Sequence, residues 1–466
     1  MTVPPVKKLC VLFGPTSIEE IARLEWPQAQ VHRLLRVDCP PGPGAIPYDA
    51  AHVQAAIRGR QVGPDLARAI LRLNEDVNCL WLAERDRNGF FDGSFLAPVA
   101  LANCARFAWS LLDELAPDLV VFHNHPHELF TYVLLRLALH RGVATYLVHF
   151  SALPWRACVS RYDADGAIHK LKLRHAWSEA EATGVDDYMR RLRSSHDSAI
   201  PHADRALIAA GHKPLDLQHE LRHLLRGSPA KNLLRIWRKW NLYHAFLAAV
   251  SEPPAAPYVV FLMHYQPEES SMPRGGIFAQ QLNALLRLRA ALPEQIAIVV
   301  KENKATFRAP LALAIGVRSR DFYAALCSLP NTWLVPLERD TFELIDRALA
   351  VATITGSVGM EALCRGRPVI IFGDANYEHF AGVTRLASDF AGSALKRVAE
   401  GAGHDAATTR RDLLGELLLS VGPAAENNET NALSQRLATV QAFEFLGANL
   451  QQLAAQAQGA AVVEQQ

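Results

Sequence analysis

The chain has 466 residues, of which 50% are hydrophobic and 20% are charged, and its formal net charge is +1. This length predicts two domains, and the near-zero charge argues against a general affinity for nucleic acid. No apolar run reaches the ~20 residues that a membrane-spanning helix needs, and the N-terminus has no apolar stretch long enough for a secretory signal. Seven cysteines without CxxC pairs or metal-ligand spacing favour reduced thiols, so we expect a cytoplasmic protein.

The N-terminal part is expected to be an α/β domain. Apolar runs predict strands at Leu9–Phe13 and Val77–Leu82, and amphipathic patterns predict helices at Asp65–Leu73 and Leu101–Leu115. The segment Cys39–Pro47 is expected to be a loop because its prolines and glycines oppose both helix and sheet.

A βαβ unit comes next, with polar residues at the end of its first strand. Leu119–Phe122 predicts a strand, 123–128 is the polar cluster HNHPHE, Leu129–His140 predicts a helix and Ala144–Phe150 a second strand. We expect His125 and Glu128 to be the catalytic base or nucleophile, because they would lie at a strand end. Zinc is disfavoured because no second ligand cluster is apparent. The alternative is that these side chains only cap the following helix.

Residues 175–250 are expected to form a helical insertion. Within it, 231–247 places Trp and Leu residues at helical spacing among basic residues. Such a helix could lie on a membrane surface, which makes 231–247 a candidate for peripheral contact with the inner membrane. We favour the alternative, in which the helix packs against its own domain and its basic face is solvated.

The proline-rich segment 251–257 is the expected domain boundary. After it, strands are predicted to alternate with helices, which indicates a doubly wound parallel sheet. The strands are expected at Tyr258–Met263, Ile296–Val300, Thr332–Val335, Val351–Thr355 and Val369–Phe372. We therefore expect an N-terminal domain over 1–250, a C-terminal Rossmann-like domain over 251–400, and helices with a frayed tail over 401–466.

The segment 350–373 is a βαβ unit with a Gly-Ser turn. Such a turn brings the N-terminus of a helix to the carboxyl edge of the sheet, where anions bind in open α/β folds. Ser357 and this helix terminus would bind phosphate, and Glu361 would accept hydrogen bonds from ribose. The alternative is that Gly356 and Gly366 serve only as turn and cap.

The other strand ends of this domain are also polar, which indicates a nucleotide site along one edge of the sheet. The GxxxxGK and GxGxxG phosphate motifs are absent from the chain, which argues against ATPases and ordinary dehydrogenases. The candidate donor-binding residues are His264, Gln266, Glu268, Lys301, Glu302, Lys304, Gly356, Ser357, Glu361 and Tyr377.

Two α/β halves joined by a hinge suggest the B-type glycosyltransferase (GT-B) architecture, with two Rossmann-like domains facing across a cleft and added helices. The segments HYQPEES, VVKEN, PLERDTFELI and TITGSVGMEALCRGRPVIIFGDANY resemble the capsule polysaccharide biosynthesis family, which includes retaining β-Kdo transferases. The resemblance covers roughly 258–377, and DLVVFHNHPHE is similar to the family's N-terminal strand end. Gln266 with Pro267 matches its QP motif, and Ser357 with Glu361 matches its S-x-x-x-E donor motif.

One motif departs from the family. Its K-E-H-P sequence is here Lys301-Glu302-Asn303-Lys304, so the histidine that resembles a phosphate contact is replaced. Asn303 or Lys304 could take its place, or the donor could be a nucleotide sugar other than CMP-Kdo.

The resemblance implies a cytoplasmic glycosyltransferase that moves a sugar, Kdo or a related one, from a CMP- or UDP-linked donor to a glycan or glycolipid acceptor. No metal or further cofactor is expected, since the one DxD match, Asp163-Ala164-Asp165, fits the turn of a hairpin better. Two alternatives are a UDP-sugar 2-epimerase and a non-catalytic protein of polysaccharide assembly or export. Because fold does not by itself give function, only a donor-consumption assay separates these three.

Overall fold

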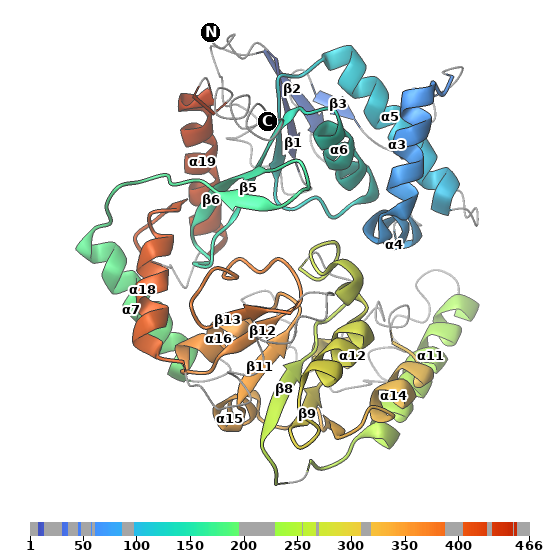
Figure 1. Ribbon diagram of the computed structural model, residues 1–466, viewed down its shortest axis with the longest axis vertical. Helices are drawn as coiled ribbons and strands as arrows, with labels where there is room; N and C mark the ends of the chain where they lie inside the picture. Colours follow the sequence, from blue (N-terminus) through green and yellow to red (C-terminus); the bar gives the residue numbers. More distant parts are fainter. Residues whose placement is uncertain are drawn as a thin grey trace. The chain divides into compact units, whose positions relative to one another are not determined.

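The computed structural model describes residues 8–13, 30–35, 45–47, 57, 61–85, 97–194, 229–253, 255–266, 270–308, 318–386, 404–425, 431–450 and 452–453 (Figure 1). The chain divides into two compact units. Unit 1 contains 1–184 and 414–466, and unit 2 contains 185–413. Each has an α/β architecture built on a largely parallel sheet.

The described elements of unit 1 are β1 (Lys8–Phe13), β2 (Gln30–Leu35), β3 (Ala45–Pro47), α3 (Pro64–Glu75), α4 (Val77–Arg85), α5 (Ala97–Leu115), β4 (Leu119–His123), α6 (Leu129–His140), β5 (Ala144–Phe150), β6 (Ala157–Tyr162), β7 (Ile168–Lys170), β14 (Ser420–Val421) and α19 (Asn431–Ala448). Helix α7 (Glu179–Ser194) and helix α18 (Ala406–Glu416) carry the chain from one unit to the other.

Strands β3, β2, β1, β4 and β5 are neighbours in that order and run parallel, and β6 and β14 extend the sheet antiparallel. Numbered along the chain, the parallel part has the order 3-2-1-4-5 of a Rossmann half-sheet and its continuation. Strand β4 is buried throughout, as expected for a parallel strand covered on both faces.

The C-terminal segment completes unit 1. Helix α19 places Ala438, Ala442 and Phe443 in one hydrophobic cluster with β4, β5 and β6. The guanidinium of Arg156, which is fully buried, donates to the carbonyls of Ser420, Gly422 and Pro423 and pairs with Glu181 at 3.0 Å. The end of the chain is therefore part of the first unit.

The described elements of unit 2 are α11 (Pro229–Ala249), β8 (Tyr258–Leu262), the 3-10 helix η1 (Gly276–Ala279), α12 (Gln281–Ala291), β9 (Ala297–Lys301), α13 (Ala305–Arg308), α14 (Arg320–Cys327), β10 (Thr332–Val335), α15 (Thr341–Arg347), β11 (Ala350–Thr353), α16 (Val358–Cys364), β12 (Val369–Ile371) and β13 (Val383–Arg385). The sheet order is β10-β9-β8-β11-β12-β13, and every described pairing in it is parallel. This is the 3-2-1-4-5-6 order of the Rossmann fold.

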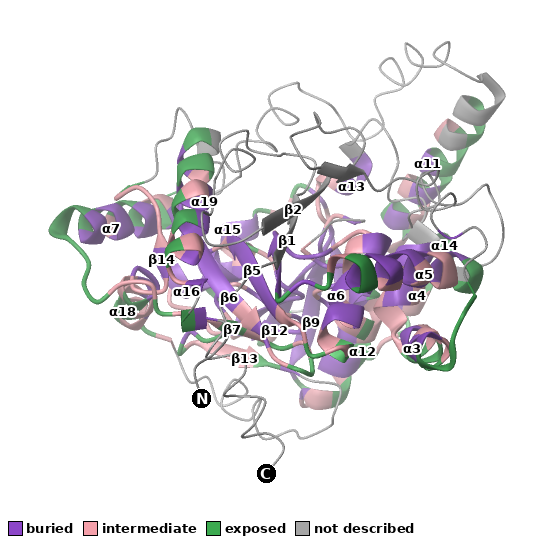
Figure 2. Ribbon diagram, turned by 90° about the horizontal axis from the view of Figure 1, so that it is seen from above, coloured by how far each residue is buried: buried purple, intermediate pink, exposed green. Residues whose placement is uncertain are grey.

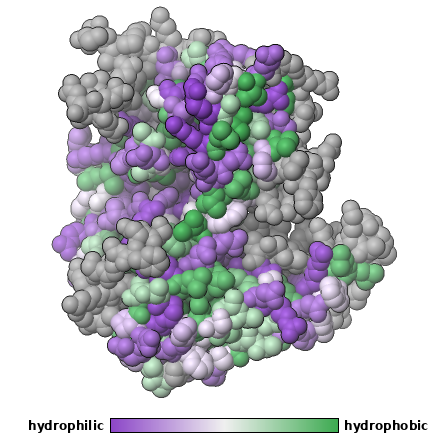
Figure 3. All heavy atoms as spheres, turned by 45° about the vertical axis from the view of Figure 1, so that its right-hand side comes forward, coloured by the Kyte–Doolittle hydropathy of each residue, from purple (hydrophilic) through white to green (hydrophobic). Residues whose placement is uncertain are grey.

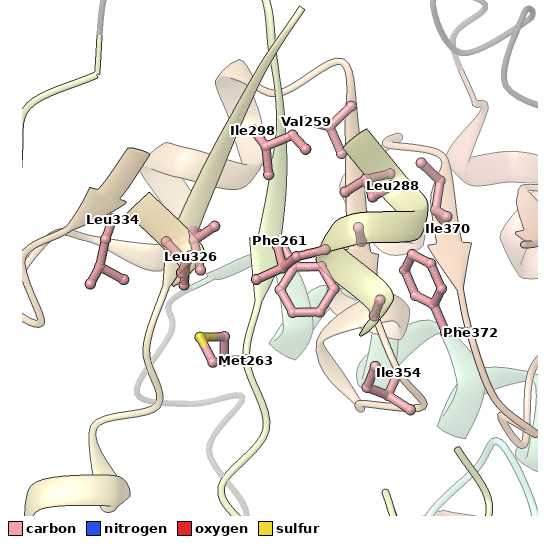
Figure 4. Packing of buried hydrophobic residues seen from close by; sticks show 14 of the residues in the cluster. Val259, Phe261, Met263, Leu288, Ile298, Leu326, Leu334, Ile354, Ile370 and Phe372 are labelled. Atoms are coloured by element: carbon pink, nitrogen blue, oxygen red, sulfur yellow. The ribbon is translucent and has the colours of Figure 1, made fainter. Parts of the chain in front are cut away.

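The core of unit 2 lies between this sheet and its helices. Figure 4 shows Phe261 of β8 near Leu288 of α12, with Phe372 close by. Phe261 and Phe372 have ring centroids 6.0 Å apart. Helix α11 adds Leu242 and Phe246 to the same cluster.

Two segments of unit 1 differ from their sequence predictions. Val77–Leu82, predicted as a strand, lies in helix α4, because Asp76 accepts the amide of Asn78 and the buried Cys79, Leu82 and Ala83 follow helical spacing. Ala45–Pro47, placed in a loop, forms β3, the outer neighbour of β2, where proline is tolerated.

The region after 405, expected to be only helical, contains β14. The expected boundary near 250 also differs from the units, because α11 packs on α14 within unit 2 and 414–466 belongs to unit 1. Residues 195–228 of the expected helical insertion lie outside the described residues.

Candidate functional site

The candidate site of unit 2 lies at the carboxyl ends of β8 and β11. These strands pair in parallel although they are not consecutive in the chain, so the order of the sheet reverses between them. Open α/β sheets bind ligands at such a reversal, outside the carboxyl ends of the strands. The chain places His264 just after β8 and Gly356-Ser357 just after β11.

His264 links the two strand ends. Its Nε2 atom accepts a hydrogen bond from the main-chain N–H of Thr355 at 3.2 Å and lies 3.1 Å from the hydroxyl of Thr353. Since the amide can only donate, Nε2 acts as an acceptor, and the Thr353 hydroxyl is the donor in the second contact. The buried imidazole therefore holds the turn after β11 in place.

Glycine allows this close packing. A Cβ on Gly356 would lie 2.8 Å from the Thr353 hydroxyl and 3.3 Å from Nε2 of His264. A Cβ on Gly359 would lie 2.1 Å from the phenolic oxygen of Tyr377. That oxygen donates a hydrogen bond to the carbonyl of Gly356. Tyr377 is thus a buried brace of the turn, and burial raises its pKa.

Ser357 and Glu361 differ sharply in exposure. Ser357 is the exposed N-cap residue of α16, and its hydroxyl makes no capping hydrogen bond. Glu361 is only 6% exposed, and burial raises its pKa to about 7, against the opposing charge of Arg365. The turn therefore presents a hydroxyl with a half-protonated carboxyl close behind it along the chain.

Lys301 and Lys304 supply positive charge at the end of β9. The Lys301 ammonium is 3% exposed and donates to the carbonyl of Leu337 at 2.8 Å. Burial and then the charge of Lys304 lower the pKa of Lys301 to about 8, and the nearby carboxylates of Glu338, Asp340 and Glu302 oppose this shift. An anion beside the two ammonium groups would relieve their mutual repulsion.

The altered motif has a local structural role. The side-chain oxygen of Asn303 accepts the amide of Ala305 at 2.9 Å, and its carbonyl accepts the amide of Thr306 at 3.0 Å. Asn303 therefore starts helix α13. Of the two residues considered as substitutes for the missing histidine, the half-buried Lys304 is the one whose charge acts on Lys301.

Glu302 forms a buried ion pair. Its carboxylate accepts from Arg318 at 2.9 Å, from the hydroxyl of Tyr323 at 3.0 Å and from the hydroxyl of Thr306 at 3.2 Å. Glu302 is 1% exposed and Arg318 is 4% exposed. Glu302 therefore has partners within the protein, and it supports the site from below the surface.

Gln266 belongs to the same network. Its amide nitrogen donates to the carbonyl of Ala279 at 2.7 Å, and its oxygen accepts from Gln281 at 2.7 Å and from Arg318 at 3.2 Å. The side chain of Gln281 also bonds both main-chain groups of His264. The predicted Gln266, Glu302 and His264 are thus brought together, whereas Glu268 and Pro267 lie outside the described residues.

Sequence reasoning missed Arg318 and Gln281. Arg318 bonds Glu302, Gln266 and the carbonyl of His264, which lies 54 positions earlier in the chain. Neither residue sits in a motif or at a strand end, so no sequence signal pointed to this long-range pairing.

The candidate residues of unit 1 come after β4. His125 is 8% exposed, and its ring lies edge-on to His149 with centroids 5.1 Å apart. His149 in turn contacts the Ser160 hydroxyl through Nε2 at 2.8 Å. Glu128 is the N-cap residue of α6, where Thr131 bonds both its amide and its carbonyl. Helix capping, the alternative weighed from the sequence, is therefore one observed role of Glu128.

The DxD match forms a hairpin turn, as the sequence predicts. Strands β6 and β7 pair antiparallel, and Asp163 accepts the amides of Asp165 and Ala167 at 3.1 and 2.8 Å. Among the described residues, no group of three or more His, Cys, Asp or Glu side chains is placed to hold a metal ion.

Comparison with known proteins supports the family resemblance. Residues 320–400 match the model of the capsule polysaccharide biosynthesis protein family. This range contains Ser357, Glu361 and Tyr377, so the resemblance expected from the sequence is confirmed there. No curated protein sequence matches the chain significantly.

Several solved structures resemble the chain. One is KpsC, a beta Kdo 2,7 transferase of Thermosulfurimonas dismutans, with 13% identity, 66% of this chain and 89% of that chain covered, and a TM-score of 0.28. Another is UDP-GlcNAc 2-epimerase from Neisseria meningitidis, with 12% identity, 89% and 99% covered, and a TM-score of 0.24. The calicheamicin glycosyltransferase shares 14% identity over 95% and 99%, with a TM-score of 0.21. Likenesses with TM-scores this low do not distinguish one activity from another.

Proposed function

We propose that the protein is a glycosyltransferase of capsule or surface polysaccharide synthesis, and that unit 2 binds its nucleotide-sugar donor. The observation that carries the proposal is the junction of β8 and β11, where His264 fixes a Gly-Ser turn inside the segment that matches the capsule family. The donor would be CMP- or UDP-linked, and the acceptor would be a glycan or glycolipid.

The chemistry of the junction suits a nucleoside phosphate. The Ser357 hydroxyl is exposed and would donate to phosphate oxygen, while Lys301 and Lys304 would neutralise the phosphate as it leaves. Glu361 would accept ribose hydroxyls once a ligand reaches it, which favours its ionised form. Fixed positive charge near a leaving phosphate is the main electrostatic requirement of such a transfer.

Gln266, Glu302, Arg318 and Gln281 act as positioning residues in this proposal. Their hydrogen bonds hold the main chain of His264 and the start of the Lys301–Lys304 segment. His125 and Glu128 of unit 1 remain our candidates for the base or nucleophile, since both follow a parallel strand in a second Rossmann-like sheet.

The first experiment is a thermal-shift panel of CMP, UDP, GDP, CDP and ADP with the full chain. A ligand that binds only the folded state at about 100 times its Kd stabilises by about 2.7 kcal/mol, so one nucleotide should raise the unfolding midpoint clearly. Ser357→Ala and Lys301→Met should weaken this shift. The matched control is Ser328→Ala, another exposed serine, which bonds only its own helix α14.

The second step is donor consumption with and without an acceptor glycan. A transferase releases nucleotide only with acceptor, and Glu128→Gln should then slow release without changing the thermal shift. Release of UDP without acceptor would favour the epimerase alternative. Nucleotide binding without turnover would favour an assembly protein, and no response to any nucleotide would overturn the donor site.

A further inference from the structure

Helix α11 carries a line of exposed apolar side chains. The line consists of Leu233, Trp237, Trp240, His244 and Leu247, spaced four, three, four and three residues apart, so that they share one face. We call this line the outer stripe. Trp237 is 62% exposed, and Leu233, Leu247 and Trp240 are 54%, 46% and 42% exposed. Figure 2 shows exposed residues along this helix, and Figure 3 shows hydrophobic and hydrophilic residues interspersed on one face of the molecule.

The opposite face of α11 anchors the helix in the core of unit 2. Leu242 and Phe246 are buried, and the Phe246 ring lies 5.1 Å from Phe307 and 5.7 Å from Tyr323 between centroids. Tyr323 in turn bonds the buried Glu302. The outer stripe is therefore presented on a firmly packed helix.

The exposed apolar residues cluster on this helix. Of the thirteen large hydrophobic residues that are exposed among those described, five lie in α11, the four apolar members of the stripe and Leu234. Single exposed apolar residues need no explanation, whereas a contiguous group marks a surface that another apolar phase covers.

The charge of the helix decides between the possible partners. Over its 21 residues α11 contains Lys231, Arg235, Arg238 and Lys239 and no acidic residue. Arg238 is exposed beside Trp237. Two copies packed through this face would bring like charges together, whereas an anionic lipid surface complements them. Tryptophan and arginine together also suit the lipid–water interface, which is apolar on one side and wet on the other.

We propose that the outer stripe of α11 docks the protein on an anionic lipid surface, with Trp237 and Trp240 in the headgroup region. This contact lies on the surface only, since none of the described helices is both long and apolar enough to cross a bilayer. The proposal does not depend on the donor site, because it rests on different residues.

The test is co-sedimentation of the full chain with vesicles of phosphatidylcholine alone or mixed with phosphatidylglycerol. We expect binding to the anionic vesicles, weakened by salt, and a loss of about tenfold or more in partitioning for Trp237→Ala/Trp240→Ala. Arg238→Glu should weaken binding to the anionic vesicles only. Trp177→Ala is the matched control, since Trp177 is 42% exposed in unit 1 and should leave binding unchanged.

Several outcomes would overturn the proposal. These are no binding to anionic vesicles, equal binding to neutral ones, or equal loss in the Trp177→Ala control. A dimer in light scattering without lipid that disappears in Trp237→Ala/Trp240→Ala would assign the stripe to a second copy instead. Each variant is first checked for an unchanged thermal unfolding midpoint, which is expected because the side chains are exposed.

Discussion

The two units share a strand order but differ in the segment that comes after the fourth strand of that order. After β4 the chain continues through His123 and His125, both buried, to Glu128 at the start of a twelve-residue helix. After β11 it makes a Gly-Ser turn with an exposed hydroxyl and enters a seven-residue helix. The shared topology therefore sets the place for a site at the sheet edge, and the residues at that edge set its chemistry.

The electrostatics of the two edges differ in the same sense. Burial lowers the pKa of His123 to about 4, so this imidazole is neutral at physiological pH. The edge in unit 2 instead holds Lys301 and Lys304 near a carboxyl whose pKa lies at about 7. Only the second edge has fixed cations among its described candidate residues, which is why we assign the phosphate to it.

Breaking a buried arginine in each unit should give the largest effect. Arg318→Met leaves Glu302 buried without its cation, and Arg156→Met does the same to Glu181, so each should destabilise its unit by about 3–5 kcal/mol. Urea unfolding measures the loss. Only Arg318→Met should also weaken the nucleotide-induced thermal shift.

The double variant Glu302→Gln/Arg318→Met controls for the orphaned charge and should recover part of the stability. If Arg156→Met weakened nucleotide binding as strongly as Arg318→Met, the assignment of the two edges would have to be reversed or abandoned.

Glu361→Gln should stabilise unit 2, in a pH-dependent way. The pKa of Glu361 is about 7 when folded and 4.5 ordinarily, so the folded state holds the extra proton and stability falls as pH rises between these values. The penalty is complete above pH 7 and amounts to about 3 kcal/mol. The variant should therefore gain roughly that much at pH 8 and almost nothing at pH 4, as measured by urea unfolding at both pH values. An equal gain at both would show that burial of the charge is not the cause.

Gly359→Ala should give a smaller loss. Its Cβ would overlap the Tyr377 phenol, which must move, so we expect unit 2 to lose about 2 kcal/mol in calorimetry. Gly415→Ala is the matched control in helix α18, because no atom lies within 4 Å of its Cβ. It should be neutral or stabilising by up to ~1 kcal/mol, since alanine favours helix. Equal effects at the two positions would contradict the close packing of the turn.

Much of the sheet structure was predictable because its strands are buried on both faces. The apolar runs at Leu119–Phe122 and Ala144–Phe150 of unit 1 and at Thr332–Val335 of unit 2 correspond to β4, β5 and β10. Val77–Leu82 failed because a short apolar run fits a buried helix face equally well. The Gly-Ser turn was also visible in the sequence, since glycine and serine interrupt an apolar strand.

The supporting network was not predictable. Nothing local in the sequence shows that Arg318 meets Glu302 or that Gln281 holds both main-chain groups of His264. Burial changed the interpretation of several residues as well, because a carboxylate such as Glu302 looks available in sequence and is used internally in the structure.

The C-terminal residues that complete unit 1 also bear on how the chain is made. Unit 2 lies wholly within 185–413, so all of it has left the ribosome before the strand and helix that finish unit 1 are synthesised. Arg156 must wait for Ser420 and Gly422 before its charge is satisfied, and until then β6 lacks its neighbour β14. The part of the protein that is translated first is therefore the last to become complete.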